Sequence, residues 1–381
     1  MKHHLYNKNF KFEKYPVNFN KNTERNFLQY CLGGTLYMPG TKNILEKLLY
    51  KKLTDITSLV MCFEDAIHED DLPKAEENVL FHLDSIADKI EQGAIIVDDL
   101  PLIFIRVRNK EQFRQFSERL TQRQISVLSG FTFPKFDSYA AIEYLNILEQ
   151  INTKFNTIIY GMPILEGKTI AYKETRNEEL HILKTVLEPY KHLILNIRIG
   201  GADFSSLFGV RRGINYSIYD ILPVRDCLSD ILNFFNRAED DYLVSAPVWE
   251  YFLAYKQDDI NNLLKQDLHH SLLNRVTIIN EAIDGLLREV ILDKANGFVG
   301  KTIIHPSHAR FVNAMQTVTK EEYDDAMQIL NTSGGVIKSC TGNKMNEINP
   351  HRSWAIKIVN RANAFGVVKT EDEILALLFD K

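Results

Sequence analysis

Thr57–Asp65 reads TSLVMCFED, an apolar run that ends in two acids. An amphipathic stretch around Ala75–Ile90 follows it, and the same alternation of apolar run and amphipathic stretch recurs along the chain. Parallel strands that are buried on both faces look like this, and in a βα unit each strand is followed by a helix. The stretch therefore indicates one βα unit in a series.

Seven further runs of this kind bring the number of expected strands to eight. They are Gly33–Gly40, Pro101–Asn109, Gly130–Lys135, Thr157–Glu166, His192–Phe204, Asp241–Val248 and Gly300–Pro306. Eight βα units in series predict an α/β fold of the (β/α)8 TIM-barrel type, which takes about 250 residues. An open doubly wound sheet is the alternative, but it usually carries a glycine-rich first turn, and no GxGxxG follows the first run.

The barrel divides the 381 residues into three expected parts. These are an N-terminal arm over 1–30, the barrel over 31–310 and a helical C-terminal appendage over 311–381. The first 25 residues hold six Lys and Arg against two acids and include His3 and His4, so we expect an exposed arm. In the appendage, helical patterns surround a glycine-containing loop and cover Lys320–Ile329, Trp354–Ala364 and Glu371–Leu378.

Composition indicates which kinds of partner and which cellular compartment to expect for this protein. The formal net charge of −5, from 45 Lys and Arg against 50 Asp and Glu, gives no general attraction for nucleic acid or an anionic membrane. No apolar run reaches the roughly 18 residues that a membrane-spanning helix needs, and no signal-peptide pattern is present. The four cysteines are scattered, and we expect Cys31, Cys62 and Cys227 to be buried, which favours a reduced, cytoplasmic compartment.

Polar residues close several of the apolar runs at their carboxyl ends. They are Glu64, Asp65, Arg106, Arg108, Lys135, Glu166, Asp203 and His305. Barrel enzymes carry their chemistry at this end of the strands, and a buried charge without a partner costs several kcal/mol. We therefore expect these side chains to face one another across one site.

Glu166 and Asp203 close consecutive runs, and two carboxylates supply hard oxygen ligands of the kind that Mg²⁺ prefers. The sequence thus suggests a divalent-metal site. The alternative is that Glu166 pairs with Lys168 and that Asp203 caps the helix that follows it. Gly201 and Ala202, just before Asp203, would let the backbone approach a substrate closely.

Arg106 and Arg108 are two residues apart in one run, so both should point to the same face. A guanidinium suits a carboxylate or a developing enolate oxygen, and we expect Arg106 to be the functional one. Bridging to Glu64 or Asp65 is the alternative. His305 is more often a hydrogen-bonded structural residue than a base in such a position. The chain shows no nucleophile elbow, Walker loop or zinc-type cluster, which weighs against hydrolase and NTPase functions.

Taken in order, these segments resemble the HpcH/HpaI aldolase and citrate lyase β-subunit superfamily, TIM-barrel enzymes that make or break carbon–carbon bonds with Mg²⁺. The resemblance runs from about Gly33 to about Ala364. It rests on TLYMPG, CFEDAI followed by Lys74, IRVRN, GFTFPK, Glu166 with GGADF, GFVGKTIIHP and a late GNKMNE segment.

The resemblance implies a metal-dependent lyase or aldolase acting on a small 2-oxo acid, hydroxy acid or acyl derivative. Glu166 and Asp203 would bind Mg²⁺, or Mn²⁺, Arg106 would steady the substrate oxygen, and Glu64 and Asp65 would lie beneath the metal. It also implies a homo-oligomer, a trimer or hexamer, in which an acid such as Glu347 from a neighbouring subunit can reach the site.

Two departures from the family pattern argue against a coenzyme A thioester as substrate. Gly33 and Gly34 stand where the family usually has an Arg-Ser pair, and Glu76 and Glu77 lie where an arginine is expected. Two other functions therefore stay open. One is an inactive ligand-binding barrel that serves as a partner in a larger assembly, and the other is a thioester hydrolase of the same fold.

Overall fold

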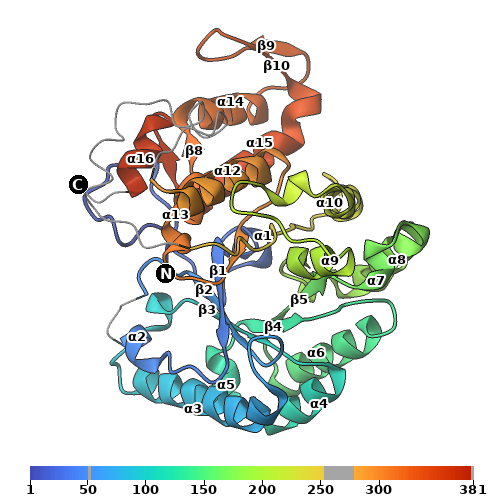
Figure 1. The fold of residues 1–381 in the computed structure, drawn as a ribbon. Helices are drawn as coiled ribbons and strands as arrows, with labels where there is room; N and C mark the ends of the chain where they lie inside the picture. The colour runs from blue at the N-terminus through green and yellow to red at the C-terminus, as the bar shows by residue number, and fades with distance from the viewer. Residues whose placement is uncertain (50–52, 253–278, 379–381) are drawn as a thin grey trace.

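The computed structural model describes residues 1–49, 53–252 and 279–378. Its centre is a curled sheet of seven parallel strands in the order β6-β5-β4-β3-β2-β1-β7 (Figure 1). The strands are β1 (Gly34–Pro39), β2 (Ser58–Cys62), β3 (Leu102–Arg106), β4 (Gly130–Phe133), β5 (Tyr160–Leu165), β6 (Arg198–Ile199) and β7 (Lys301–Ile303). Each lies within one of the apolar runs from which the barrel was predicted.

The remaining run, Asp241–Val248, forms no regular strand and contributes two isolated parallel bridges. Val244 pairs with Ile197, next to β6, and Ala246 pairs with Lys301 at the start of β7. Backbone hydrogen bonds reach both neighbours, including the Ile197 amide to the Leu243 carbonyl at 2.9 Å and the Val299 amide to the Val244 carbonyl at 2.9 Å. These contacts close the sheet into a barrel, so the predicted TIM-barrel class is confirmed.

Helices surround the barrel and alternate with its strands. They are α1 (Arg25–Leu28), α2 (Leu45–Leu49), α3 (Leu72–Glu91), α4 (Lys110–Arg119), α5 (Gln122–Val127), α6 (Ala141–Phe155), α7 (Lys168–Ala171), α8 (Lys173–Leu187), α9 (Gly201–Leu207), α10 (Leu222–Phe235), α12 (Glu281–Ala295) and α13 (His308–Met315). Short 3₁₀ turns lie at η1 (Glu69–Asp71), η2 (Val97–Asp99), η3 (Glu188–Leu193) and η4 (Ile218–Asp220).

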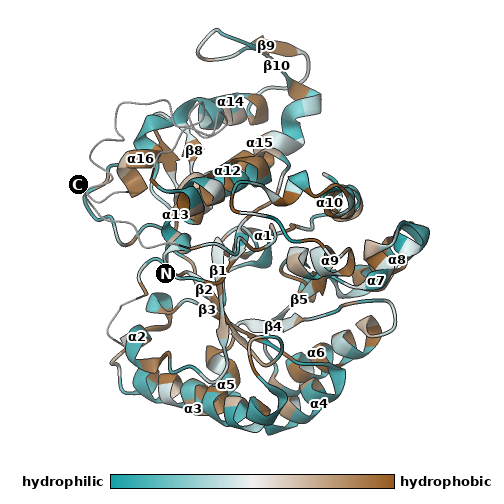
Figure 2. Ribbon diagram, in the orientation of Figure 1, coloured by the Kyte–Doolittle hydropathy of each residue, from teal (hydrophilic) through white to brown (hydrophobic). Residues whose placement is uncertain are grey.

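Helix α3 shows why these segments form and where they pack. Ala75, Val79, Leu83 and Ile86 recur every three or four residues and are buried, which gives the helix one apolar face toward the sheet. In Figure 2 the outer sides of α3 and α4 are mainly hydrophilic, while the strands inside are apolar. The amphipathic stretch predicted around Ala75–Ile90 corresponds to α3.

The C-terminal region packs around its own small apolar cluster, which includes Val318, Ala326, Ile358 and Val367. Its elements are β8 (Val318–Thr319), α14 (Lys320–Leu330), β9 (Val336–Lys338), β10 (Met345–Glu347), α15 (Ile348–Phe365), β11 (Val367–Val368) and α16 (Asp372–Leu378). The three helical patterns expected in this region correspond to α14, α15 and α16.

The glycine-containing loop of this region turns out to be a β9–β10 hairpin, which extends away from the barrel (Figure 1). Glu347 is exposed at the end of that hairpin.

The expectation of an exposed N-terminal arm is wrong. His3 and His4 are 1% and 5% exposed, and the His3 ring stacks on Phe365 at 4.2 Å between centroids. The Glu13 amide also donates to the Val367 carbonyl at 2.9 Å. Phenylalanines and tyrosines interleaved with the lysines give this segment enough apolar surface to pack on the C-terminal region, an effect that its charge count concealed.

His4 makes this packing sensitive to acid. Burial lowers the pKa of its imidazole from 6.5 to about 3. His4 binds a proton easily only in the unfolded chain. The stabilisation that the folded state gains from its neutral, buried imidazole is therefore complete above pH 6.5 and is lost as the pH falls toward 3. We expect the free energy of unfolding to drop by ~2 kcal/mol from this group between pH 7 and pH 5.

Urea unfolding at the two pH values measures this loss. The His4→Gln variant should lack this part of the pH dependence, and His181→Gln, at an exposed position of α8, should keep it. An identical pH dependence in wild type and His4→Gln would refute the assignment.

Two further sequence predictions concern burial and membranes. Cys31, Cys62 and Cys227 are buried as expected, and Cys340 is exposed. Among the residues that the structure describes, no helix has the length and apolar character needed to cross a membrane.

Candidate active site

A cavity of about 380 Å³ opens at the carboxyl ends of the barrel strands. Strand ends and the turns after them line it, and its polar and glycine residues are Tyr37, Cys62, Asp65, Arg106, Glu166, Arg198, Gly200, Gly201, Asp203 and Thr302, with Ala202 beside them. Catalytic groups of TIM-barrel enzymes gather at this end of the strands. The cavity is thus the candidate active site, and it holds most of the residues that the sequence singled out.

Glu166 and Asp203 meet across Gly200. A Cβ atom built on Gly200 would lie 2.2 Å from Glu166 Oε2 and 2.9 Å from Asp203 Oδ2, so only glycine leaves room for both carboxyl groups. Glu166 also accepts the Lys135 amide at 2.8 Å. Neither structural alternative holds, because Glu166 has this partner in place of Lys168 and the N-cap of α9 is Gly200.

Burial and repulsion between acids outweigh the attraction of Arg106 at this pair. Burial, followed by repulsion from Asp203, raises the pKa of Glu166 to about 8. Burial raises the pKa of Asp203 as well. A cation between the two groups would remove this penalty, since opposite charge favours the ionised carboxylates.

These two carboxylates are oxygen donors that could hold a divalent cation in the cavity. Within it, no three His, Cys, Asp or Glu side chains form a metal-binding cluster. A hard cation bound by two carboxylates keeps positions for water and substrate oxygens, which is common for Mg²⁺. The residues therefore fit a metal shared with substrate better than a closed protein cage.

Arg106, the last residue of β3, lines the same cavity and is held in place by two acids. Its Nη2 lies 2.6 Å from Glu64 Oε2 and 3.0 Å from Asp65 Oδ2, while its Nε donates to Cys62 Sγ at 3.1 Å. Glu64 is buried and also pairs with Lys135 Nζ at 2.6 Å. Arg106 thus both faces the cavity and bridges to Glu64 and Asp65. Glu64 lies beside the guanidinium and orients it.

Lys135 connects Glu64 and Glu166, because it donates a hydrogen bond to each of them. Its backbone adopts φ +47°, in the left-handed region that residues other than glycine seldom enter. This conformation lets one residue serve two acids, with the amide on Glu166 and the ammonium on Glu64. Strain of this kind, at a cost of order 1–3 kcal/mol, clusters at functional sites.

Arg108 and His305 do not join this group. Because β3 ends at Arg106, the alternation of side chains stops there, and Arg108 donates to the Phe63 carbonyl at 3.3 Å. The expectation that both arginines share one face is wrong. His305 lies 2.7 Å from Ser307 Oγ and stacks on Phe252, which matches its structural interpretation.

The cavity residues that the sequence did not single out as site residues include Tyr37, Arg198 and Thr302. Arg198 carried a usable clue, because a charge in the middle of the apolar run LILNIRIGG must face either a partner or a site. Tyr37 gave none, since a tyrosine within a strand is usually a packing residue.

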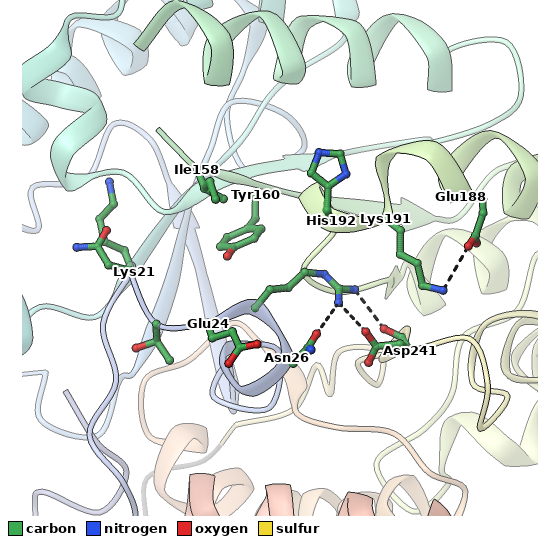
Figure 3. Close-up of a pocket in the computed structure, with 12 residues that line it drawn as sticks. Lys21, Glu24, Asn26, Ile158, Tyr160, Glu188, Lys191, His192 and Asp241 are labelled. Atoms are coloured by element: carbon green, nitrogen blue, oxygen red, sulfur yellow. Dashed lines mark hydrogen bonds and ion pairs between the residues drawn. The ribbon is translucent and has the colours of Figure 1, made fainter. Parts of the chain in front are cut away.

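A larger cavity, of about 830 Å³, lies at the amino ends of the strands, where Tyr160 begins β5 and Asp241 precedes the bridging segment. Figure 3 shows Lys191 paired with Glu188, at 3.4 Å. Arg25 pairs with Asp241 at 2.9 Å. Since these four charges are paired and this end of a TIM barrel carries stability, the smaller cavity is the better candidate.

Comparison with known families agrees with this geometry. The model of the family described as the C–C bond lyase of the TIM-barrel fold matches residues 26–367. This chain belongs to that family. None of the curated proteins compared with it matches.

Solved structures of similar fold include CitE and RipC. CitE of Mycobacterium tuberculosis in complex with magnesium, acetoacetate and coenzyme A is 15% identical, with a TM-score of 0.51 over 88% of this chain and 99% of that one. RipC of Yersinia pestis is 14% identical, with a TM-score of 0.48 over 77% and 99% of the two chains. For this member of the C–C bond lyase family, the similarity to CitE at 15% identity supports the fold alone.

Proposed function

We propose that this member of the C–C bond lyase family is a metal-dependent lyase or aldolase that acts on a small 2-oxo acid or a related carboxylate. The observation that carries the proposal is the meeting of Glu166 and Asp203 across Gly200, in a cavity that Arg106 also lines. The two carboxylates would hold Mg²⁺, or Mn²⁺ in its place. When bound, such an ion supplies Lewis acidity and a template for substrate oxygens.

The protein's own contribution is the placement of charge around the bond that breaks. In a 4-hydroxy-2-oxo acid, the 4-hydroxyl loses its proton and the bond between C3 and C4 breaks, which gives a carbonyl product and an enolate whose negative charge lies on the 2-oxo oxygen. Arg106, fixed by Glu64 and Asp65, presents N–H donors to that oxygen without moving during the reaction. Donors oriented in advance usually make the greatest contribution to the rate in this type of catalysis. Glu64 and Asp65 act as positioning residues in this proposal.

Coenzyme A is left out of the proposed substrate. A Cβ atom at Gly33, where the family usually has arginine, would lie 2.3 Å from Asn313 Oδ1 and 2.7 Å from the His3 ring. The backbone there also has φ +59°, which favours glycine. CitE, which was solved with coenzyme A, is thus a guide to the carboxylate chemistry and a weaker one to the thioester.

Calorimetric titration with Mg²⁺ tests the metal assignment without relying on turnover. Wild type should bind the ion, and the double variant Glu166→Ala/Asp203→Ala should bind it at least tenfold more weakly, because it has lost both anionic ligands. Glu188→Gln, which removes a partly exposed carboxylate at the opposite end of the barrel, is the control and should bind like wild type. Unchanged Mg²⁺ affinity in the double variant would refute the assignment of Glu166 and Asp203 as metal ligands.

Product analysis separates the lyase from a thioester hydrolase, because only hydrolysis leaves the carbon skeleton of the acid intact.

A further inference from the structure

Arg198 is a buried arginine at the floor of the cavity. Its side chain belongs to the fully buried set, with a residue exposure of 1%. It comes from β6, two residues before Gly200, and so lies one layer deeper in the barrel than Glu166 and Asp203. It nevertheless lines the cavity, which makes it the deepest cationic group along its wall.

The neighbours of Arg198 are neutral. Its Nη1 donates to Thr35 Oγ1 at 3.3 Å and its Nη2 to Thr302 Oγ1 at 2.7 Å. The guanidinium carbon lies 5.5 Å from the centroid of the Tyr37 ring. Thr35 and Thr302 are register partners on the neighbouring strands β1 and β7, so their two hydroxyl groups accept hydrogen bonds from the guanidinium at the same level of the barrel.

What this arginine lacks is an anion. In residues 1–49, 53–252 and 279–378, no Asp or Glu forms an ion pair with Arg198, and its buried Nε has no hydrogen-bond partner. Two other buried arginines have acidic partners, since Arg176 pairs with Asp230 at 2.8 Å and Arg212 with Glu250 at 2.6 Å. Burying a charge without a partner costs several kcal/mol, so a group that enters the cavity is the natural source of the missing anion.

Arg106 cannot serve the same end of a ligand. Its guanidinium carbon lies 5.8 Å from the centroid of the Tyr37 ring, and its charge is already neutralised by Glu64 and Asp65. The cavity therefore has one compensated arginine near the paired carboxylates and one uncompensated arginine at its floor. A planar guanidinium matches a carboxylate, and Arg198 has N–H groups beyond the two that donate to Thr35 and Thr302.

We propose that Arg198, supported by Thr35 and Thr302, is a specificity-determining residue that binds a second carboxylate of the substrate, at the end remote from Glu166 and Asp203. The inference rests on the proposed function for the identity of the first, 2-oxo acid end. It narrows the substrate class to dicarboxylic 2-oxo acids or their aldol adducts. A monocarboxylic acid of equal length would leave Arg198 without its counter-charge.

Two ligands of equal chain length test this inference: 2-oxoglutarate, with two carboxylates, and 2-oxopentanoate, with one. Calorimetry on the Mg²⁺-loaded protein should show wild type binding the dianion at least tenfold more tightly. In Arg198→Met this preference should vanish, with the affinity for 2-oxopentanoate unchanged, and Arg198→Lys should keep part of it. Equal affinities of wild type for the two acids, or no binding of the dianion, would overturn the inference.

Thermal unfolding distinguishes a binding role from a structural one. Because replacing an uncompensated buried charge by an apolar group is often neutral or stabilising, Arg198→Met should melt at or above the wild-type temperature. Arg176→Met is the matched control, since this buried arginine is ion-paired and donates to the Ile170 carbonyl at 2.7 Å. It should melt lower and keep the dianion preference. A large loss of stability in Arg198→Met would mark Arg198 as structural.

Succinate, which has no 2-oxo group, separates this inference from the proposed function. If it binds wild type without Mg²⁺ and fails to bind Arg198→Met, the anion subsite stands even if no metal-dependent chemistry is found. If 2-oxo acids bind in a Mg²⁺-dependent way but Arg198→Met binds them all like wild type, the proposed function stands and the subsite does not.

Discussion

Replacement of Arg106 by alanine should lower kcat/KM for the cleavage of a 4-hydroxy-2-oxo acid by about 10³-fold, the upper end of what one oriented donor to a developing oxyanion contributes. Arg106 is the cationic group placed by two acids at the mouth of the cavity, at 2.6 Å from Glu64 and 3.0 Å from Asp65. Its loss would leave the negative charge of the transition state without its donor. Release of the 2-oxo acid product, followed with time, gives the rate.

Arg108→Ala is the matched control for this experiment. It removes a guanidinium two residues further along the same segment, where the side chain donates to the Phe63 carbonyl outside the cavity. Its rate should stay within about threefold of wild type. Equal losses in the two variants would show that the effect belongs to the fold. Complete absence of turnover in wild type would favour the inactive ligand-binding barrel.

Lys301→Met should destabilise the folded chain by about 3–5 kcal/mol, the usual cost of breaking a buried ion pair by removing one partner. Lys301 Nζ lies 2.8 Å from Glu289 and 2.8 Å from Asp293, and all three side chains are at most 1% exposed. The variant would leave Glu289 with Arg212 as its cationic partner, and Asp293 with the hydrogen bond that the Tyr219 hydroxyl donates to it.

Urea unfolding at pH 7 measures this effect, with Lys110→Met as the control. The Lys110–Glu143 pair, at 3.0 Å, is about one-third exposed on each side, so its loss should cost less than ~1 kcal/mol. A Lys301→Met variant as stable as the control would mean that the cluster is dispensable.

The positions of the strands could be predicted because each strand of a parallel barrel has the same sequence pattern, an apolar run with polar residues at its carboxyl end. Each strand must be apolar on both faces, and its polar end must face solvent or a site. Five residues that close such runs come together in the structure, namely Glu64, Asp65, Arg106, Glu166 and Asp203.

The features that escaped prediction depend on closure of the ring and on packing between distant segments. Whether Arg198 meets an acid or a threonine depends on β1 and β7, more than a hundred residues away along the chain from Arg198. The burial of His3 depends in the same way on Phe365. The roles of the site residues stay predictions, as does the homo-oligomeric state; these residues are Glu64, Asp65, Arg106, Glu166, Gly201, Ala202 and Asp203.

The short bridging segment at Val244 and Ala246 gives the barrel a seam. Elsewhere neighbouring strands share regular ladders, but between β6 and β7 the ring is joined by isolated bridges. Arg198 on β6 spans this seam through its hydrogen bond to Thr302 on β7. If Arg198 binds an anion, the ligand contacts the same side chain that connects β6 and β7 by a hydrogen bond. Ligand binding would then stabilise the part of the barrel in which isolated bridges join the strands.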